Sequence, residues 1–218
     1  MNSRDDILAR VRAALPHLAA TREARRQAAL AHIAARGRGP GPIAGGDLPA
    51  LFAARSSAMS STVERVAAFS DVPAAVARYL AAGHLPCQAV CWHALQALDW
   101  TGAGLSVDAR AARESDLVGI TGVFCAIAET GTLMLRSGPR TAATTSLLPE
   151  THVAVVPVDR IVASMEDAFA LLRAEHDELP RAVNLVSGPS RTGDIEQTIV
   201  LGAHGPYRVH LVVVDAPA

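Results

Sequence analysis

Two valine-rich runs constrain the fold of this chain more than any other feature of its sequence. They cover residues 152–157 and 209–215, and apolar side chains occupy almost every position in both. A strand with this pattern is buried on both faces, which is typical of parallel sheets. Segments with helical periodicity separate these runs from shorter strand candidates at 88–92, 105–107 and 182–186. The sequence therefore predicts an α/β fold, a mainly parallel sheet with helices on both faces.

The other predicted elements rest on periodicity, capping signals and turn residues. Helices are expected at 7–15 (ended by Pro16), 21–36, 60–69, 72–82 and 165–174, the last capped by Ser164 with Asp167 three positions on. Residues 126–129 and 132–135 are typical of a hairpin around Thr130 and Gly131.

A stretch rich in glycine and proline indicates how the chain is divided. Residues 37–47 favour a flexible connector over regular structure. We therefore expect an N-terminal helical arm at 1–36, a linker at 37–47 and an α/β domain at 48–218.

Composition excludes several classes of function. All 20 basic residues among the 218 are arginine, so a Schiff-base lysine, a pyridoxal-phosphate anchor and a Walker-type phosphate loop are excluded. A net charge of -1 and an aromatic content of 4% argue against nucleic-acid binding. Three cysteines without a disulfide pattern, and no apolar run of the ~18 residues that span a bilayer, predict a cytoplasmic protein with no membrane span.

The segment from Ser187 to Glu196 is the first candidate ligand site. It follows a predicted strand and precedes the apolar residues 197–201, so we expect a strand, a tight loop and a short helix. Gly188 and Pro189 favour the turn. The backbone N–H groups at the start of such a helix, together with Arg191, can hold an anion. A capped helix start that binds nothing is the plain alternative.

The predicted hairpin turn supplies the second candidate. Glu129 stands beside the hydroxyls of Thr130 and Thr132, where it can act as a general base, a nucleophile or a ligand anchor. A hairpin tip that only faces solvent is the alternative. Groups that can bind a carboxylate or a phosphate, or simply form a polar loop, follow within a few positions: Arg136, Arg140, Thr141, Thr144, Thr145 and Ser146.

We expect both bends at the carboxyl ends of the parallel strands, where ligands collect in such sheets. His204 can point at the same crevice, although an ordinary turn histidine is the simpler interpretation. The expected ligand is a small anion, and the cofactor is unknown. The predicted ligand-binding residues are Glu129, Thr130, Gly131, Thr132, Ser187, Gly188, Pro189, Ser190, Arg191, Thr192, Asp194, Glu196 and His204.

Four zinc-type side chains within ten residues raise the question of a metal site. They are His84, Cys87, Cys91 and His93. In a strand, Cys87 and Cys91 would lie about 13 Å apart, too far for one ion. Buried thiols are therefore the favoured interpretation. The four-cysteine runs that hold iron–sulfur clusters are also missing, so no such cluster is expected in this chain.

Four segments carry a similarity to a known family: residues 127–132, 146–149 before the run at 152–156, 187–196, and 202–206. Taken together, they resemble the LUD-domain family, and within it the lactate utilization protein C (LutC/YkgG) group. The similarity runs from about residue 120 to 214, and the opening helix is similar as well, whereas residues 37 to about 104 match poorly.

The resemblance implies a fold like that of ribose-5-phosphate isomerase and CoA transferases (NagB/RpiA/CoA-transferase-like). It also implies a part in oxidising L-lactate to pyruvate alongside iron–sulfur oxidoreductase subunits. The family supplies no established catalytic residue for this component, and Glu129 is the candidate from the residues alone. Related folds host unrelated chemistries, so the fold by itself assigns none.

Three functional hypotheses follow from these observations. The first is a subunit of a lactate-oxidising complex without its own redox centre, which binds a small anion. The second is a stand-alone enzyme of the CoA-transferase or cyclo-ligase type that uses Glu129 as its reacting carboxylate. The third is a non-catalytic assembly or regulatory subunit that docks through residues 1–36.

Overall fold

The computed structural model describes residues 3–14, 22–39, 46–176, 178–195 and 198–216. Residue contacts divide the chain into two units, residues 1–41 and residues 42–218. Pro16, the predicted end of the first helix, lies outside the described residues. Across the described ranges, none of the helices combines the length and apolar character that a bilayer crossing requires.

The first unit contains the two predicted helices. They are α1 (Ser3–Ala14) and α2 (Arg22–Ala35). None of the described residues of α2 is buried. Large apolar side chains are exposed on both helices: Ile7, Val11, Leu30 and Ile33.

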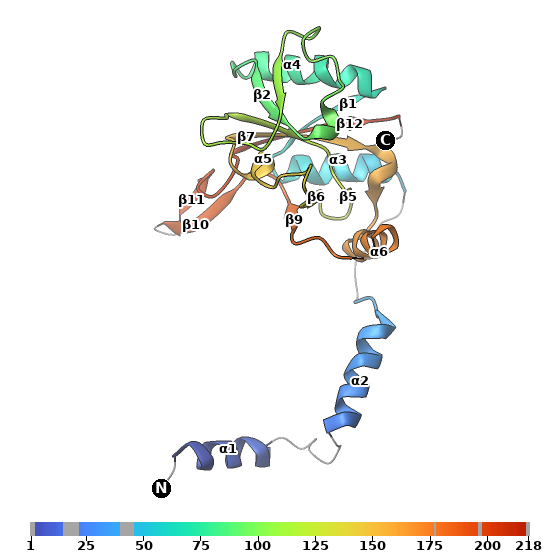
Figure 1. Cartoon of the computed structure of the whole chain (residues 1–218), viewed down its shortest axis with the longest axis vertical. Coiled ribbons are helices and arrows are strands. Elements are labelled where there is room, and N and C mark those ends of the chain that lie inside the picture. Colours follow the sequence, from blue (N-terminus) through green and yellow to red (C-terminus); the bar gives the residue numbers. More distant parts are fainter. Residues whose placement is uncertain (1–2, 15–21, 40–45, 177, 196–197, 217–218) are drawn as a thin grey trace. The chain divides into compact units, whose positions relative to one another are not determined.

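A six-stranded parallel sheet organises the second unit (Figure 1). Its strands, in spatial order, are β1 (Thr62–Val66), β12 (Arg208–Val214), β7 (Thr151–Pro157), β4 (Val118–Thr121), β2 (Gln88–Cys91) and β3 (Ser106–Ala109). The two valine-rich runs form β7 and β12, which pair in parallel from Thr151 and Arg208 to Pro157 and Val214. The prediction of an α/β fold built on a mainly parallel sheet is confirmed.

Helix α4 (Val72–Ala82) covers one face of this sheet (Figure 1). Its sequence favours this role because a proline in the first turn is compatible with helix initiation and its apolar residues recur on one side. Four of them are buried against the valines of β7 and β12: Val72, Ala75, Val76 and Leu80. The predicted helix at 72–82 is confirmed.

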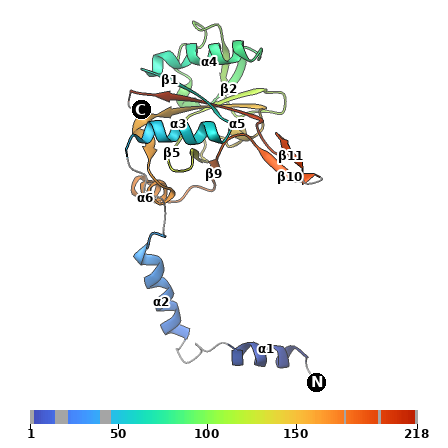
Figure 2. The same cartoon turned by 180° about the vertical axis from the view of Figure 1, so that it is seen from behind.

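The opposite face is covered by helix α3 (Leu48–Ala58) and by a second sheet (Figure 2). The second sheet contains, in order, β8 (Ile161–Val162), β5 (Cys125–Ile127), β6 (Thr132–Arg136) and β9 (Val183–Val186). Phe52 of α3 and Leu133 of β6 belong to the same buried cluster as Leu211 of β12. The expectation of helices on both faces is therefore refined, since a helix and a small sheet share this face.

Helix α6 (Met165–Glu175) packs on the outer side of the second sheet. Its buried Ala168 and Leu172 lie in one apolar cluster with Ile127 and Met134. The predicted cap is present: the N–H of Asp167 donates to the Ser164 hydroxyl over 3.2 Å, and the Asp167 carboxylate accepts from the Ser164 N–H. The second unit thus has four layers, with α4 and α6 on the outside.

Two predicted helices are wrong. Residues 60–69 contain β1, which pairs with β12 at the sheet edge. The charged residues Glu64 and Arg65 are compatible with the solvent-facing side of a helix, but an edge strand also exposes polar side chains. Residues 197–201 contain β11 (Thr198–Leu201), which forms an antiparallel hairpin with β10 (Arg191–Ile195). Three consecutive β-branched residues in β11 favour the strand.

Short helix α5 (Thr144–Leu147) fixes the approach of a polar loop to the main sheet. It lies over Gly119 of β4, where the absence of a side chain leaves room for the backbone. A Cβ atom on Gly119 would stand 2.0 Å from the carbonyl oxygen of Thr145. Close packing between α5 and β4 therefore requires glycine at this position.

We predict that Gly119→Ala lowers the free energy of unfolding by about 1–3 kcal/mol or more, because the added methyl group must displace α5. Urea denaturation followed by circular dichroism measures this change. Gly122→Ala is the matched control, since the nearest atom to its Cβ is 4.0 Å away on Trp92. Equal stability of the two variants would contradict the packing argument.

Two histidines are buried in the main sheet. His152 of β7 shares a 2.8 Å hydrogen bond with the Thr121 hydroxyl, and burial lowers its pKa to about 4. His210 of β12 shares a 2.8 Å hydrogen bond with Thr62 and stacks on Tyr79 with 4.0 Å between ring centroids. Burial lowers the pKa of His210 to about 4 as well. Both imidazoles are therefore neutral in the folded protein at neutral pH.

These histidines predict a loss of stability in mild acid. The unfolded chain takes up protons near the ordinary histidine pKa of 6.5, whereas the folded chain resists protonation down to about 4. Stability is therefore full above pH 6.5 and falls as the pH drops toward 4, by on the order of 3 kcal/mol for each histidine. Urea denaturation across this range should show a shallower pH dependence for His152→Gln; an unchanged slope would refute the assignment.

Candidate functional site

A pocket of about 400 Å³ lies where three segments of the second unit meet. The segments are the loop between β9 and β10, the turn between β11 and β12, and the end of α5. Residues that line it are Ser146, Leu147, Leu185, Val186, Ser187, Gly188, Pro189, Ser190, Arg191, His204, Gly205, Pro206 and Val209. We call it the Ser187 pocket.

Backbone hydrogen bonds join the first two of these segments. The N–H of Ser190 donates to the carbonyl of Pro206 over 2.8 Å, and the N–H of Gly202 donates to the carbonyl of Ser190 over 2.9 Å. The positive φ of Gly202, +79°, is a conformation that glycine adopts without strain. This turn carries His204 into the lining of the pocket.

A chain of hydroxyls connects the Ser187 loop to the predicted hairpin turn. The Thr130 and Thr132 hydroxyl oxygens lie 2.7 Å apart, and the Thr132 oxygen lies 2.6 Å from that of Ser187. Leu133 of β6 pairs antiparallel with Val186 of β9, which places the adjacent residues Thr132 and Ser187 opposite each other. The two bends, distant in sequence, are therefore adjacent in the fold.

The C-terminal end of α3 rests on a glycine from each bend. A Cβ on Gly131 would lie 2.5 Å from the Ser56 nitrogen, and one on Gly188 would lie 2.2 Å from the Met59 carbonyl oxygen. Both glycines have positive φ angles, +66° and +72°. The Ser56 hydroxyl also donates to the Gly131 carbonyl over 3.3 Å. This helix, which the sequence analysis missed, holds both bends in place.

Arg191 reaches from the pocket to the same end of α3. Its guanidinium donates to the Met59 carbonyl over 3.0 Å and to the Ser60 hydroxyl over 2.6 Å. These acceptors are neutral, and no ion pair of Arg191 with a carboxylate is found among the described residues. Arg191 is exposed at the rim of the pocket.

Glu129 points elsewhere. Its carboxylate accepts a 3.0 Å hydrogen bond from the Met165 N–H at the first turn of α6. A carboxylate is favourable at this position because it complements the positive end of the helix dipole. Glu129 is half-buried and is not part of the pocket lining, so the catalytic role suggested by the sequence stays a prediction.

The Ser187 pocket lies by the amino ends of the parallel strands. Val209 lies at the start of β12, Pro206 lies just before that strand, and α5 leads into β7. The expectation that both bends lie at the carboxyl ends is therefore wrong. Its physical cause is the placement of β9, which pairs antiparallel with β6 in the second sheet.

The structure brings only some of the predicted ligand residues to the pocket. Those that line it are Ser187, Gly188, Pro189, Ser190, Arg191 and His204. Those outside its lining are Glu129, Thr130, Gly131, Thr132 and Thr192. Glu196 lies outside the described residues, and only the backbone of Asp194 is described. Because residues 198–201 form strand β11, the predicted helix start does not supply the anion site.

Sequence reasoning missed the apolar part of the pocket and the contribution of α3. Leu147, Leu185 and Val209 line the pocket without any polar signal. The sequence did contain a signal for the start of α3, since an aspartate at position 47 is followed by a proline in the first turn. In the structure, the Asp47 carboxylate accepts a 3.0 Å hydrogen bond from the Ala50 N–H.

The cysteine and histidine cluster does not converge on an ion. In the described part of the chain, no three His, Cys, Asp or Glu side chains gather closely enough to hold a metal. Cys91 is buried, as expected, and desolvation raises its pKa to about 11. Cys87 is exposed, which corrects the expectation that both thiols are buried.

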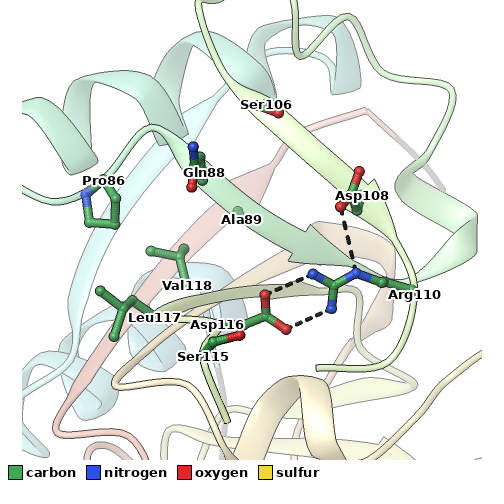
Figure 3. A pocket seen from close by; sticks show the side chains of 10 residues that line it. All are labelled: Pro86, Gln88, Ala89, Ser106, Asp108, Arg110, Ser115, Asp116, Leu117 and Val118. Carbon is green, nitrogen blue, oxygen red and sulfur yellow. Dashed lines mark hydrogen bonds and ion pairs between the residues drawn. The ribbon is translucent and has the colours of Figure 1, made fainter. Parts of the chain in front are cut away.

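A second polar pocket, of about 350 Å³, lies beside β2 and the edge strand β3 (Figure 3). Figure 3 shows the Arg110 guanidinium held between Asp108 and Asp116 in this pocket. The Asp116 carboxylate accepts two hydrogen bonds from it, of 2.6 and 2.8 Å. Two carboxylates against one guanidinium disfavour a bound anion here, which leaves the Ser187 pocket as the better candidate for one.

Named relatives resemble part of this chain. A lactate utilization protein C from Bacillus licheniformis is 35% identical over 120 residues, which covers 54% of this chain and 50% of the relative. A lactate utilization protein C 1 from Bacillus mycoides is 40% identical over 111 residues, covering 50% of this chain and 47% of the relative. The chain thus spans about half the length of the curated relatives it matches.

A solved structure and a family model cover more of the chain. The crystal structure of a DUF162 family protein from Deinococcus radiodurans superimposes with a TM-score of 0.59. It is 23% identical, and the match covers 80% of this chain and 100% of that one, which shows a common fold. The model of the LUD domain matches residues 54–214. The chain therefore belongs to the LUD domain family.

Proposed function

We propose that this protein takes part in lactate utilization and that its Ser187 pocket binds a small anionic ligand. The observation that carries the proposal is the position of Arg191. It brings an exposed cation, hydrogen-bonded to neutral groups, to a pocket lined by the hydroxyl-bearing Ser187 and Ser190 and by His204. Guanidinium and hydroxyl groups together are suited to carboxylates and phosphates.

The rigidity of the surroundings supports a binding role. Hydrogen bonds connect the Ser187 loop to the 202–207 turn, and the end of α3 packs on Gly188. A binding site that is fixed before the ligand arrives loses less conformational entropy on binding. Leu147 and Leu185 add apolar surface, which suits an organic acid with a short carbon skeleton.

The pathway assignment rests on the named relatives. Proteins called lactate utilization protein C share 35–40% identity with about half of this chain. We infer that this chain is a subunit of a system that oxidises L-lactate to pyruvate with iron–sulfur oxidoreductase partners. Its own contribution would be to bind the small anion, with the electron transfer carried by those partners.

We predict saturable binding of an organic acid anion to the purified protein. L-lactate, pyruvate and phosphate are titrated by calorimetry at constant ionic strength. Arg191→Ala should weaken binding by roughly tenfold or more, because it removes a charge-assisted hydrogen bond. Arg191→Lys should bind with intermediate affinity, since it keeps the charge but loses the planar fork.

Arg65→Ala is the matched control, since Arg65 pairs with Asp215 at the other end of β1. Circular dichroism checks that each variant is folded. Undiminished affinity in folded Arg191→Ala would remove the ligand assignment while leaving the pathway assignment standing.

A separate prediction concerns the pathway. Co-purified with candidate iron–sulfur subunits, the chain should increase lactate-dependent reduction of an artificial dye, because it completes the oxidising system. Dye reduction is compared with and without this chain. Equal rates, measured with intact co-purification, would contradict a contribution to lactate oxidation.

A further inference from the structure

A small pocket at the carboxyl ends of β2 and β3 is separate from the Ser187 pocket. It has a volume of about 50 Å³, room for a molecule of only a few non-hydrogen atoms. Its lining residues are Cys91, Trp92, His93, Arg110, Ala111, Pro139, Arg140 and Ala142. They include two arginines and a histidine and no carboxylate.

The two β-strands position one side of this pocket. Cys91 is the last residue of β2, and Trp92 and His93 follow it directly. Arg110 follows the last residue of β3, which pairs in parallel with β2. The carboxyl end of a parallel sheet is the edge at which such folds place ligands.

A tight turn after β6 supplies the other side. The Thr141 hydroxyl donates to the Arg136 carbonyl over 2.9 Å, and the Thr141 N–H donates to the Gly138 carbonyl over 3.2 Å. The indole N–H of Trp92 donates to the Ala142 carbonyl over 3.0 Å, which ties the turn to the end of β2. These three hydrogen bonds therefore hold the turn that carries Arg140.

The two arginines of this pocket differ in how their charges are balanced. Arg110 forms ion pairs with Asp108 and Asp116, which line the pocket of about 350 Å³ shown in Figure 3. Its guanidinium is thereby fixed and its charge neutralised. No carboxylate partner of Arg140 is found among the described residues. An anion entering this pocket would thus pair chiefly with Arg140.

The neighbouring side chains favour binding over covalent chemistry. Burial raises the pKa of the Cys91 thiol to about 11, so the thiol is protonated and a poor nucleophile. His93 is half-buried and contributes ring nitrogens that can hydrogen-bond an oxygen atom. The indole of Trp92 is 6% exposed and forms an apolar wall.

We propose that Arg140 and His93 form a second anion site, which takes a compact oxyanion such as phosphate or the carboxylate of a small organic acid. Arg140 supplies the charge and paired N–H donors, and His93 supplies a further hydrogen bond. Arg110, held by Asp108 and Asp116, lines this pocket as well, whereas the two aspartates line the larger pocket shown in Figure 3 and not this one. The site is separate from the Ser187 pocket, since the two linings share no residue.

Trp92 provides a direct readout, since the chain has only two tryptophans. Nitrogen–proton NMR spectra of the full chain are recorded during titrations with phosphate, acetate and L-lactate, with chloride used to hold ionic strength constant. The Trp92 indole signal, identified by its loss in Trp92→Phe, should shift saturably. Arg140→Gln should weaken the binding by roughly tenfold or more, and His93→Ala should weaken it as well.

The Arg191→Ala variant, which tests the Ser187 pocket, should leave the Trp92 shift unchanged. Saturation by phosphate alone would identify a phosphate site, saturation by the organic acids alone a carboxylate site, and both results support the proposal. An absent or non-saturating shift, an equal effect of chloride, or undiminished binding in folded Arg140→Gln would overturn it.

Discussion

The structure depends on the burial of the paired strands β7 and β12 on both faces. Their consecutive valines leave no solvent-facing side, so apolar layers must cover both faces of the sheet. Helix α4 provides one layer, and α3 with the second sheet provides the other. The requirement for this second layer brings together segments that are far apart in the sequence.

The Ser187 pocket is a consequence of that second layer. Strand β9 joins β6 in the second sheet, so the loop that follows β9 emerges beside the end of α3. Gly131 and Gly188 allow the backbone of α3 to approach both bends, where any side chain would collide. The hydroxyl contact between Thr132 and Ser187 then connects the bends directly. The same packing that buries the core therefore also shapes the pocket.

Charge is distributed unevenly around this domain. Arg110 is held by Asp108 and Asp116, and Arg160 forms an ion pair with Glu175. Hydrogen bonds from these arginines lower the pKa of Asp116 and of Glu175. Arg191 instead donates to a carbonyl and a hydroxyl. Because guanidinium groups stay charged at all physiological pH values, an arginine without a carboxylate partner beside a pocket favours anions there. This contrast underlies both proposed sites.

The sequence alone determined the elements whose signals are local. Periodic apolar residues and caps located α4 and α6, and valine content located β7 and β12 and with them the parallel sheet. The number and order of four short motifs indicated the family. Only the tertiary structure decided that β1 and β11 are strands and that Glu129 accepts a hydrogen bond from the first turn of α6, because these features depend on partners outside each segment. It also decided the position of the Ser187 pocket at the amino ends of β7 and β12, because that position follows from the pairing of β9 with β6, a strand far away in the sequence.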